Sequence, residues 1–132
     1  MTALFADAFF FLALLNKSDK GHTAALQFRK SGQPLVTTVW VLTEVGDALC
    51  AVDNRDLFLA LLDSLYELPD ARIIPASEDL FERGVELFRQ RPDKDWPLTD
   101  CISFVAMQAE GITDALTGDR HFEQAGFRAL LK

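Results

Sequence analysis

The sequence predicts an α/β fold, a three-layer α/β/α sandwich with a central parallel sheet of about five strands. Short apolar runs of strand length alternate along the chain with longer segments of helical character. This alternation favours a parallel sheet, because parallel strands need crossover connections and helices supply them. The chain has 132 residues and no Gly-, Ser- or Pro-rich linker, which indicates one domain over residues 1–132.

The first half of the chain starts with an apolar run that ends at Asp7, and an apolar segment of helical character follows directly. Pro34 separates the next helix from the second strand, and Thr38 is a suitable N-cap for the helix after that strand. The elements expected here are a strand at residues 2–6, a helix at 21–30, a strand at 35–37 and helices at 39–52 and 55–67.

The second half repeats the pattern. Pro75 closes a strand, Ser77 and Thr99 are expected N-caps, and Gly111 is expected to end the helix before the fourth strand. The elements expected here are a strand at residues 71–75, a helix at 78–90, a loop at 91–98, a helix at 100–110, a strand at 112–117, a short helix at 121–124 and a strand at 127–131.

Four carboxylates are expected at one edge of this sheet. Asp7 and Asp119 follow the first and fourth strands, Glu44 lies in the second turn of the helix after the second strand, and Asp100 lies in the first turn of the helix before the fourth. Functional sites of parallel α/β sheets lie beyond the carboxyl ends of the strands. The four acids are therefore candidate site residues that converge there.

These acids need a partner, because a buried carboxylate is costly unless it is paired, hydrogen-bonded or metal-bound. No Lys or Arg lies near Asp7, Glu44 or Asp100 within its own element. Like charges ~4 Å apart repel by about 4 kcal/mol at an effective dielectric near 20, and a dication removes this penalty. Oxygen-only ligation, with no His or Cys expected nearby, favours Mg²⁺ or Mn²⁺ over zinc and fits phosphodiester hydrolysis.

Each acid also has a simpler explanation when it is considered alone. A single Asp after a strand or at a helix start is usually a turn or cap residue, which applies to Asp7, Asp100 and Asp119. Glu44 is explained least easily in this way, because its neighbours at helical spacing include the apolar Val41 and Ala48.

Other polar residues are expected outside the site. His22 and His121 are isolated in the sequence and are expected in surface or capping roles. Asp93 and Asp95 are expected in a solvated loop, with a role for one of them as a carboxylate around the site as the alternative. Asp114 is expected to begin the fourth strand at the opposite end of the sheet.

The apolar residues predict a protein that does not span a membrane and is located in the cytoplasm. The run at residues 9–15 is too short to cross a bilayer, and Asp7 precedes it where a signal peptide would carry basic residues. Cys50 and Cys101 lie in apolar surroundings without CxxC spacing, so reduced, buried thiols are expected. The Trp and Phe residues fall at core spacing.

The net charge of −7 argues against a nucleic-acid partner until its distribution is considered. Without the four candidate site acids, 16 acids remain against 13 bases, so the rest of the surface is nearly balanced. Candidates for contact with a nucleic-acid backbone fall into two groups, with a solvated surface as the alternative for both. These are Lys17, Lys20, Arg29 and Lys30 in the first group and Arg89, Arg91 and Lys94 in the second.

Three segments of the chain resemble the PIN-domain family, and within it the VapC-type toxins of prokaryotic toxin–antitoxin systems. They are FADAFFFLALL, TTVWVLTEVGDAL and DKDWPLTDCISFVAMQAEGITDALTGDRHFEQAGF. The resemblance extends over essentially the whole chain, and the last segment is the most specific. Pro97 departs from the pattern, because this subgroup usually has Ser before Leu-Thr-Asp.

The resemblance assigns the family's acidic site to Asp7, Glu44, Asp100 and Asp119, the four residues already selected. Thr117 matches the family's hydroxyl residue before the last acid, where it would orient a ligand or water. The implied activity is that of an Mg²⁺- or Mn²⁺-dependent endoribonuclease. Its implied partners are an RNA substrate, a second copy in a homodimer and a cognate antitoxin protein.

Other functions remain open at this point. One is a stand-alone PIN nuclease, and another is a non-catalytic RNA-binding PIN module, which the intact acids argue against. A third is phosphoryl transfer through an aspartyl phosphate. Dehalogenase-type enzymes of that class need Asp-x-Asp, whereas this chain has Asp7-Ala8-Phe9, and the acidic pair and late Lys of receiver domains are not evident.

Overall fold

The computed structural model describes residues 2–132 and has one parallel sheet at its centre. The five strands lie in the order β3-β2-β1-β4-β5. Every pair of neighbours is parallel; in β1, Phe5 lies opposite Val36 of β2 and Ala115 of β4. The strands are β1 (Leu4–Ala6), β2 (Leu35–Thr38), β3 (Ala71–Ile74), β4 (Asp114–Leu116) and β5 (Arg128–Ala129).

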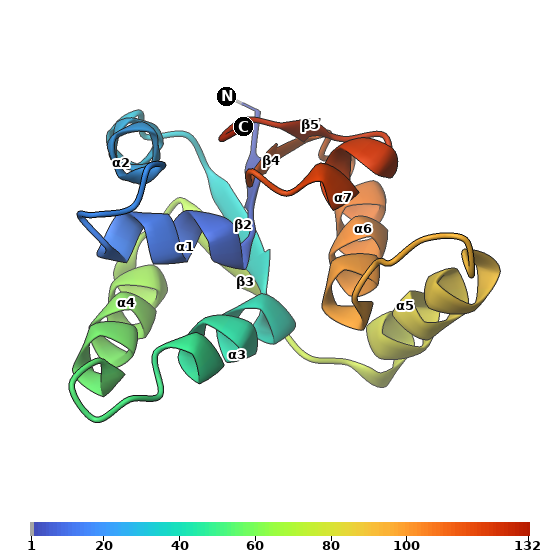
Figure 1. Cartoon of the computed structure of the whole chain (residues 1–132), viewed down its shortest axis with the longest axis horizontal. Coiled ribbons are helices and arrows are strands. Elements are labelled where there is room, and N and C mark those ends of the chain that lie inside the picture. Colours follow the sequence, from blue (N-terminus) through green and yellow to red (C-terminus); the bar gives the residue numbers. More distant parts are fainter. Residues whose placement is uncertain (1) are drawn as a thin grey trace.

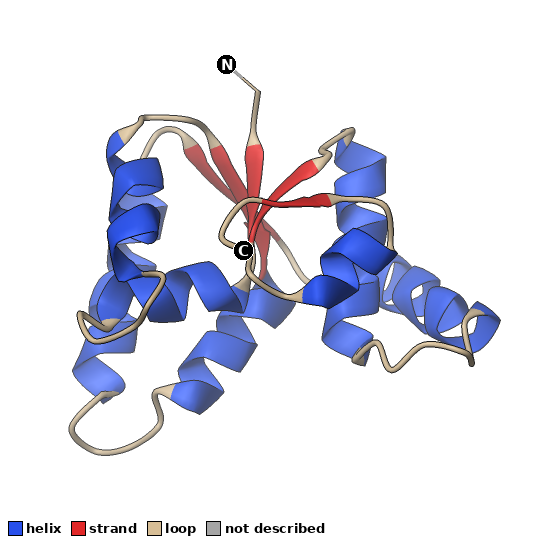
Figure 2. Cartoon of the chain, turned by 45° about the horizontal axis from the view of Figure 1, so that its top comes forward, coloured by secondary structure: helices blue, strands red, loops and turns tan. Residues whose placement is uncertain are grey.

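The helices form a layer on each side of the sheet, as Figures 1 and 2 show. One layer contains α1 (Ala8–Leu15), α2 (His22–Lys30), α3 (Val39–Ala48) and α4 (Arg55–Glu67). The other contains α5 (Glu78–Gln90), α6 (Leu98–Glu110) and α7 (Arg120–Gln124). The predicted three-layer fold with a parallel sheet is therefore confirmed.

The innermost elements read as continuous apolar sequence because both sides of them are covered. All three residues of β1 are buried, and α6 is buried without interruption from Asp100 to Met107. The ring of Phe104 makes edge contacts with Phe122 and Trp96, at centroid distances of 4.9 and 5.1 Å. Burying each such ring stabilises the fold by about 1.5–3 kcal/mol, so this cluster ties α6 firmly to α7.

Two predicted helix ends were wrong. The helix after β2 ends at Ala48 rather than residue 52, which leaves Cys50 exposed instead of buried; Cys101 is buried as expected. Helix α6 begins at Leu98, with Pro97 in extended conformation at the N-cap position, so Thr99 is inside the helix and is not its cap. Proline fits this position because its missing N–H has no partner at a helix start.

Several aromatic residues predicted as core lie partly at the surface. Phe81 and Phe88 on the outer side of α5 are 42% and 53% exposed, and Phe9 is 38% exposed. Helix α5 packs mainly on α6, so it buries one side only. Among residues 2–132, no helix is both long and apolar enough to cross a membrane.

Candidate metal centre

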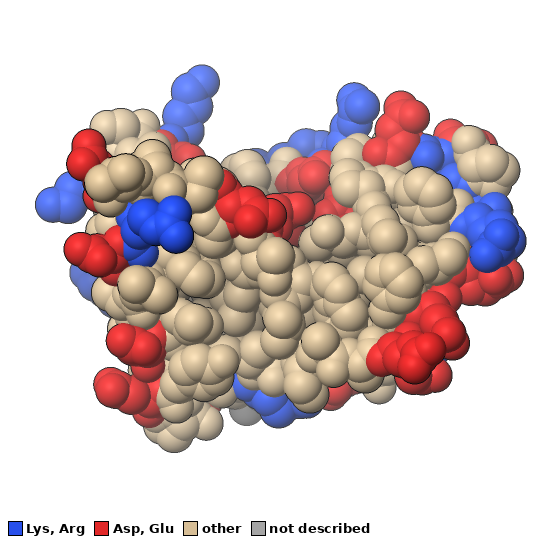
Figure 3. Space-filling model, turned by 90° about the horizontal axis from the view of Figure 1, so that it is seen from below, with Lys and Arg blue, Asp and Glu red and all other residues tan. Residues whose placement is uncertain are grey.

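The carboxyl edge of the sheet carries all four predicted acids. Asp7 directly follows β1 and Asp119 occupies the N-cap position of α7, whereas Asp100 lies in the first turn of α6 and Glu44 on α3. In Figure 1, β1 runs downward from the N-terminus. Figure 3 shows the molecule from below, so the carboxyl end of β1 faces the viewer. One group of acidic atoms lies in the upper middle of this view beside uncharged surface, and other acidic atoms, like most Lys and Arg atoms, lie toward the margins.

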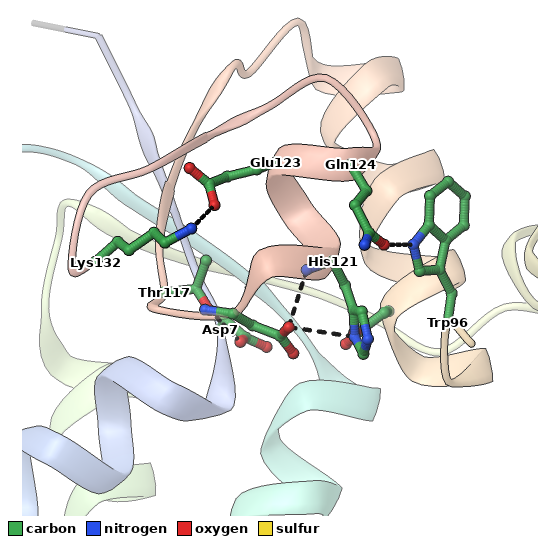
Figure 4. A network of polar contacts seen from close by, with 9 residues as sticks. Asp7, Trp96, Thr117, His121, Glu123, Gln124 and Lys132 are labelled. Carbon is green, nitrogen blue, oxygen red and sulfur yellow. Dashed lines mark hydrogen bonds and ion pairs between the residues drawn. The ribbon is translucent and has the colours of Figure 1, made fainter. Parts of the chain in front are cut away.

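Thr117 connects Asp7 and Asp119, and Figure 4 shows its side chain beside that of Asp7. Its side chain is fully buried, and Oγ1 donates a hydrogen bond of 2.8 Å to Oδ2 of Asp7, which is itself buried. The same Oγ1 accepts a bond of 3.1 Å from the backbone N–H of Asp119. One hydroxyl thus fixes the Asp7 carboxylate and the loop that carries Asp119 relative to each other.

His121 lies between the other pair of acids. Its ring Nδ1 is 3.1 Å from Oδ2 of Asp100 and 3.2 Å from Oδ1 of Asp119. Asp119 Oδ1 also accepts a bond of 2.9 Å from the backbone N–H of His121, the cap of α7. The expectation of a surface or capping role for His121, with no histidine near the acids, was therefore wrong.

Burial and mutual repulsion raise the pKa of three of these carboxyls. The pKa of Asp7 is raised mainly by burial, against the lowering effect of its Thr117 hydrogen bond. Burial, followed by the charge of Asp7, raises the pKa of Asp100 to about 7, although the His121 contact opposes the shift. For Glu44, desolvation and then the charges of Asp7, Asp119 and Asp47 raise the pKa.

Glu44 differs from the other three because its side chain is exposed. The influence of the Asp7 and Asp119 charges on its pKa places it at the same edge, on the open side of the group. The structure thus brings together Asp7, Asp100 and Asp119 within the fold and Glu44 at its margin. Their roles as ligands and catalytic groups stay a prediction.

The other candidate residues lie elsewhere. Asp93 makes a two-pronged ion pair with Arg91 on an exposed loop, as expected for a solvated segment. Asp114 begins β4 at the opposite edge, where it pairs with Arg128. His22 contacts the backbone oxygen of Ala13 at 2.8 Å.

The donor set fits a hard or borderline dication. Ligand atoms of Asp100, Asp119 and His121 lie within 4.8 Å of one another, and Asp7 repels Asp100 strongly enough to affect its pKa. Among residues 2–132, no Lys or Arg forms an ion pair with any of the four acids. A divalent cation held by these oxygens would neutralise the repulsion that the fold leaves uncompensated.

Comparison with known proteins identifies the family. The sequence profile of the PIN domain matches residues 4–128. This chain belongs to the PIN-domain family. No curated protein sequence matches it at a significant level.

Two solved structures illustrate the PIN-domain similarity. VapC20 of Mycobacterium tuberculosis, a toxin described as cleaving the sarcin-ricin loop, is 26% identical with a TM-score of 0.84, over 94% of this chain and 95% of that one. VapBC2 of Rickettsia felis, bound to a DNA fragment from its promoter, is 15% identical with a TM-score of 0.69, over 97% and 96% of the two chains, and shows the fold alone. The predicted PIN-domain membership and VapC-type resemblance are thereby confirmed.

Proposed function

We propose that this chain is a divalent-metal-dependent endoribonuclease and the toxin of a toxin–antitoxin pair. The observation that carries the proposal is the meeting of Asp7, Asp100 and Asp119 at the carboxyl edge of the sheet without a Lys or Arg partner among residues 2–132. Membership of the PIN-domain family and the similarity to VapC20, described as a sarcin-ricin loop cleaving toxin, support this chemistry.

A bound Mg²⁺ or Mn²⁺ would supply water activation and stabilise the negative charge that builds at phosphorus. Asp7, Asp100 and Asp119 would hold the ion, and Thr117 would keep the Asp7 carboxylate in one orientation. The exposure of Glu44 supports a role for it on the side from which RNA would approach. The rigid attachment of these groups to strand ends and helix starts favours a preorganised site.

One of the two basic groups is better placed for RNA contact. Lys20 lines a groove with Phe9 and has no ion-pair partner among residues 2–132. The Phe9 ring reaches the active-site loop, since a Cβ added at Gly118 would lie 2.6 Å from it. An exposed aromatic beside a free lysine and the acids suits a nucleotide, because bases stack on rings and phosphates seek positive charge.

The second basic group is largely occupied by local ion pairs. Arg91 pairs with Asp93 at 3.0 Å and lies 5.1 Å from the centre of the Trp96 ring, and Arg89 pairs with Glu86 at 3.3 Å. These contacts hold both guanidinium groups on the outer surface. We therefore favour the Lys20 side for the RNA backbone.

The antitoxin and homodimer contacts require apolar surface, and the layer of α3 and α4 offers it. A groove between these helices is lined mainly by apolar side chains, including Phe58 and Leu62, and Leu59 beside them is 53% exposed. Exposed apolar patches of this kind mark protein interfaces.

The mass of the isolated chain in solution tests the homodimer. The mass of the chain mixed with the product of a neighbouring antitoxin-like reading frame tests the antitoxin complex.

The enzymatic proposal is tested on purified chain with single-stranded RNA. Cleavage is expected with Mg²⁺ or Mn²⁺ and is expected to stop with chelator. Asp100→Asn should reduce the rate by orders of magnitude, whereas Asp114→Asn, at the far edge of the same sheet, should not. RNA binding without cleavage under all metal conditions would instead indicate a non-catalytic RNA-binding module.

A further inference from the structure

His121 has a side chain of a type that can ligate metals, and the proposed function leaves it without a role. It lies in α7, two residues after Asp119, and its imidazole is 17% exposed. It contacts the carboxylates of Asp100 and Asp119, which come from separate elements. An imidazole between two acids at the expected metal site affects which metal that site prefers.

The contacts of Nδ1 are better suited to a shared cation than to hydrogen bonding alone. Nδ1 has one hydrogen or one lone pair, depending on the tautomer, yet two carboxylate oxygens lie 3.1 and 3.2 Å away. Neighbouring ligands of an octahedral ion at 2.0–2.1 Å are separated by about 3 Å. The two observed separations match that spacing, and a central cation would use one lone pair from each atom.

The elements that carry these donors are firmly held. Asp100 is on the buried helix α6, and its side chain is 7% exposed. Helix α7 is anchored by the fully buried Phe122 and by a bond of 2.9 Å from Trp96 Nε1 to Gln124 Oε1 (Figure 4). The three donor atoms therefore keep their spacing without a bound ion, which lowers the ordering cost of binding one.

We propose that Asp100, Asp119 and His121 form a mixed oxygen–nitrogen subsite that selects a borderline transition-metal dication such as Mn²⁺ over Mg²⁺. Imidazole nitrogen suits transition metals, whereas Mg²⁺ prefers oxygen ligands alone. Asp7 and Glu44 provide the oxygen-only part of the same edge. The inference rests on the proposed metal-dependent function and specifies the metal that serves it.

Electron paramagnetic resonance of Mn²⁺ added to the metal-free chain tests the inference directly. Modulation from a directly bound histidine nitrogen is expected in the wild type, and ¹⁵N-histidine labelling should convert it to the ¹⁵N pattern. The chain has two histidines, so His22→Asn is a matched control that should keep the signal. His121→Asn should lose it and bind Mn²⁺ at least about tenfold more weakly, with a smaller change for Mg²⁺.

The wild-type spectrum decides the question even when His121→Asn fails to fold. Absence of nitrogen modulation in Mn²⁺-loaded wild type would overturn the inference, as would unchanged Mn²⁺ affinity in a folded His121→Asn chain. Because no RNA is used, the two proposals fail separately. Cleavage of RNA with Mg²⁺ but no nitrogen signal removes this inference alone, whereas a nitrogen signal without cleavage under any metal condition removes the nuclease.

Discussion

Thr117 contributes most to the site among the residues that would not touch a metal. Its hydroxyl donates a hydrogen bond to Asp7 and accepts one from the Asp119 amide, so one oxygen atom links the ends of two strands. Without it, the Asp7 carboxylate would lose the hydrogen bond that most opposes the burial-driven rise of its pKa. The ionised, metal-binding form of Asp7 therefore depends on this neighbour.

We predict that Thr117→Val weakens metal binding by about 10–100-fold, as loss of such supporting hydrogen bonds commonly does. It should also lower the free energy of unfolding by about 1–3 kcal/mol, because a buried acceptor and donor lose their partner. Calorimetric titration with Mn²⁺ measures the metal affinity, and denaturant unfolding measures the stability. Thr117→Ser keeps the hydroxyl and should therefore retain most of the metal affinity and most of the stability.

Thr37→Val is the matched control for that experiment. Thr37 is also buried and donates a bond of 2.8 Å, but to the backbone oxygen of Ala6. A similar loss of stability without a change in metal affinity is expected. Equal loss of affinity in both variants would mean that Thr117 acts only through general packing.

The acids could be predicted from the sequence, and their neighbour His121 could not. Asp7 and Asp119 follow apolar strand runs, and Asp100 heads an apolar helix, so local pattern and the strand-end rule select them. The contact of His121 with Asp100 joins residues 21 positions apart and depends on how α7 packs on α6. The available signal was its position two residues after Asp119, in the same short helix.

At the level of elements, the closeness of α5 and α6 depends on Gly84. A Cβ added there would overlap the Ile102 side chain and lie 3.2 Å from the Ile102 Cα. The backbone of α5 at Gly84 therefore packs directly against Ile102 of α6. Helix α6 carries Asp100, which makes this contact relevant to the site.

We predict that Gly84→Ala destabilises the fold by about 1–3 kcal/mol despite the higher helix propensity of alanine, because the overlap forces α5 away. Thermal unfolding measures the change. Gly46→Ala is the comparison, since its added Cβ would meet only the Phe58 ring, at 3.2–3.5 Å, and a side chain can move. A stabilised Gly84→Ala chain would show that the packing is looser than described.

The sequence located most elements but not all of their ends. Thr99 resembles an N-cap, yet α6 starts at Leu98, with the extended Pro97 at the N-cap position. The outer side of α5 carries Phe81 and Phe88, and a sequence pattern cannot tell whether a second apolar stripe meets the core or solvent.

For the whole molecule, the acid cluster makes stability depend on pH in an unusual direction. The folded-state pKa of Asp100, about 7, lies above its ordinary value of 3.8. Between these values the folded chain binds more protons than the unfolded chain, so the Asp100 contribution is present at low pH and is lost as pH rises. The raised pKa values of Asp7 and Glu44 act in the same direction.

We predict that this contribution lowers the free energy of unfolding of the metal-free chain as pH rises from about 4 to about 7. Denaturant unfolding in chelator at several pH values measures the slope, and Asp100→Asn should remove much of it. Added Mn²⁺ should restore stability at neutral pH by binding the ionised form. An identical slope in wild type and Asp100→Asn would contradict the assignment.

The overall architecture was predicted correctly because alternating strand and helix patterns leave few parallel α/β arrangements. The order β3-β2-β1-β4-β5 places the ends of β1 and β4 side by side, which brings Asp7 near Asp119. Glu44 joins from α3, where it is exposed, and the nearby Asp47 on the same helix was the sequence signal that this side borders solvent or the site.

RNA cleavage by Asp7→Asn with Mg²⁺ or Mn²⁺, measured beside its thermal unfolding, tests whether the acid cluster is a metal-dependent nuclease site. Asparagine keeps an acceptor for the Thr117 hydroxyl and removes one repelling charge from the cluster. We predict that cleavage is abolished while the unfolding temperature stays the same or rises. Metal-dependent cleavage that persists in a clean Asp7→Asn preparation would contradict the account.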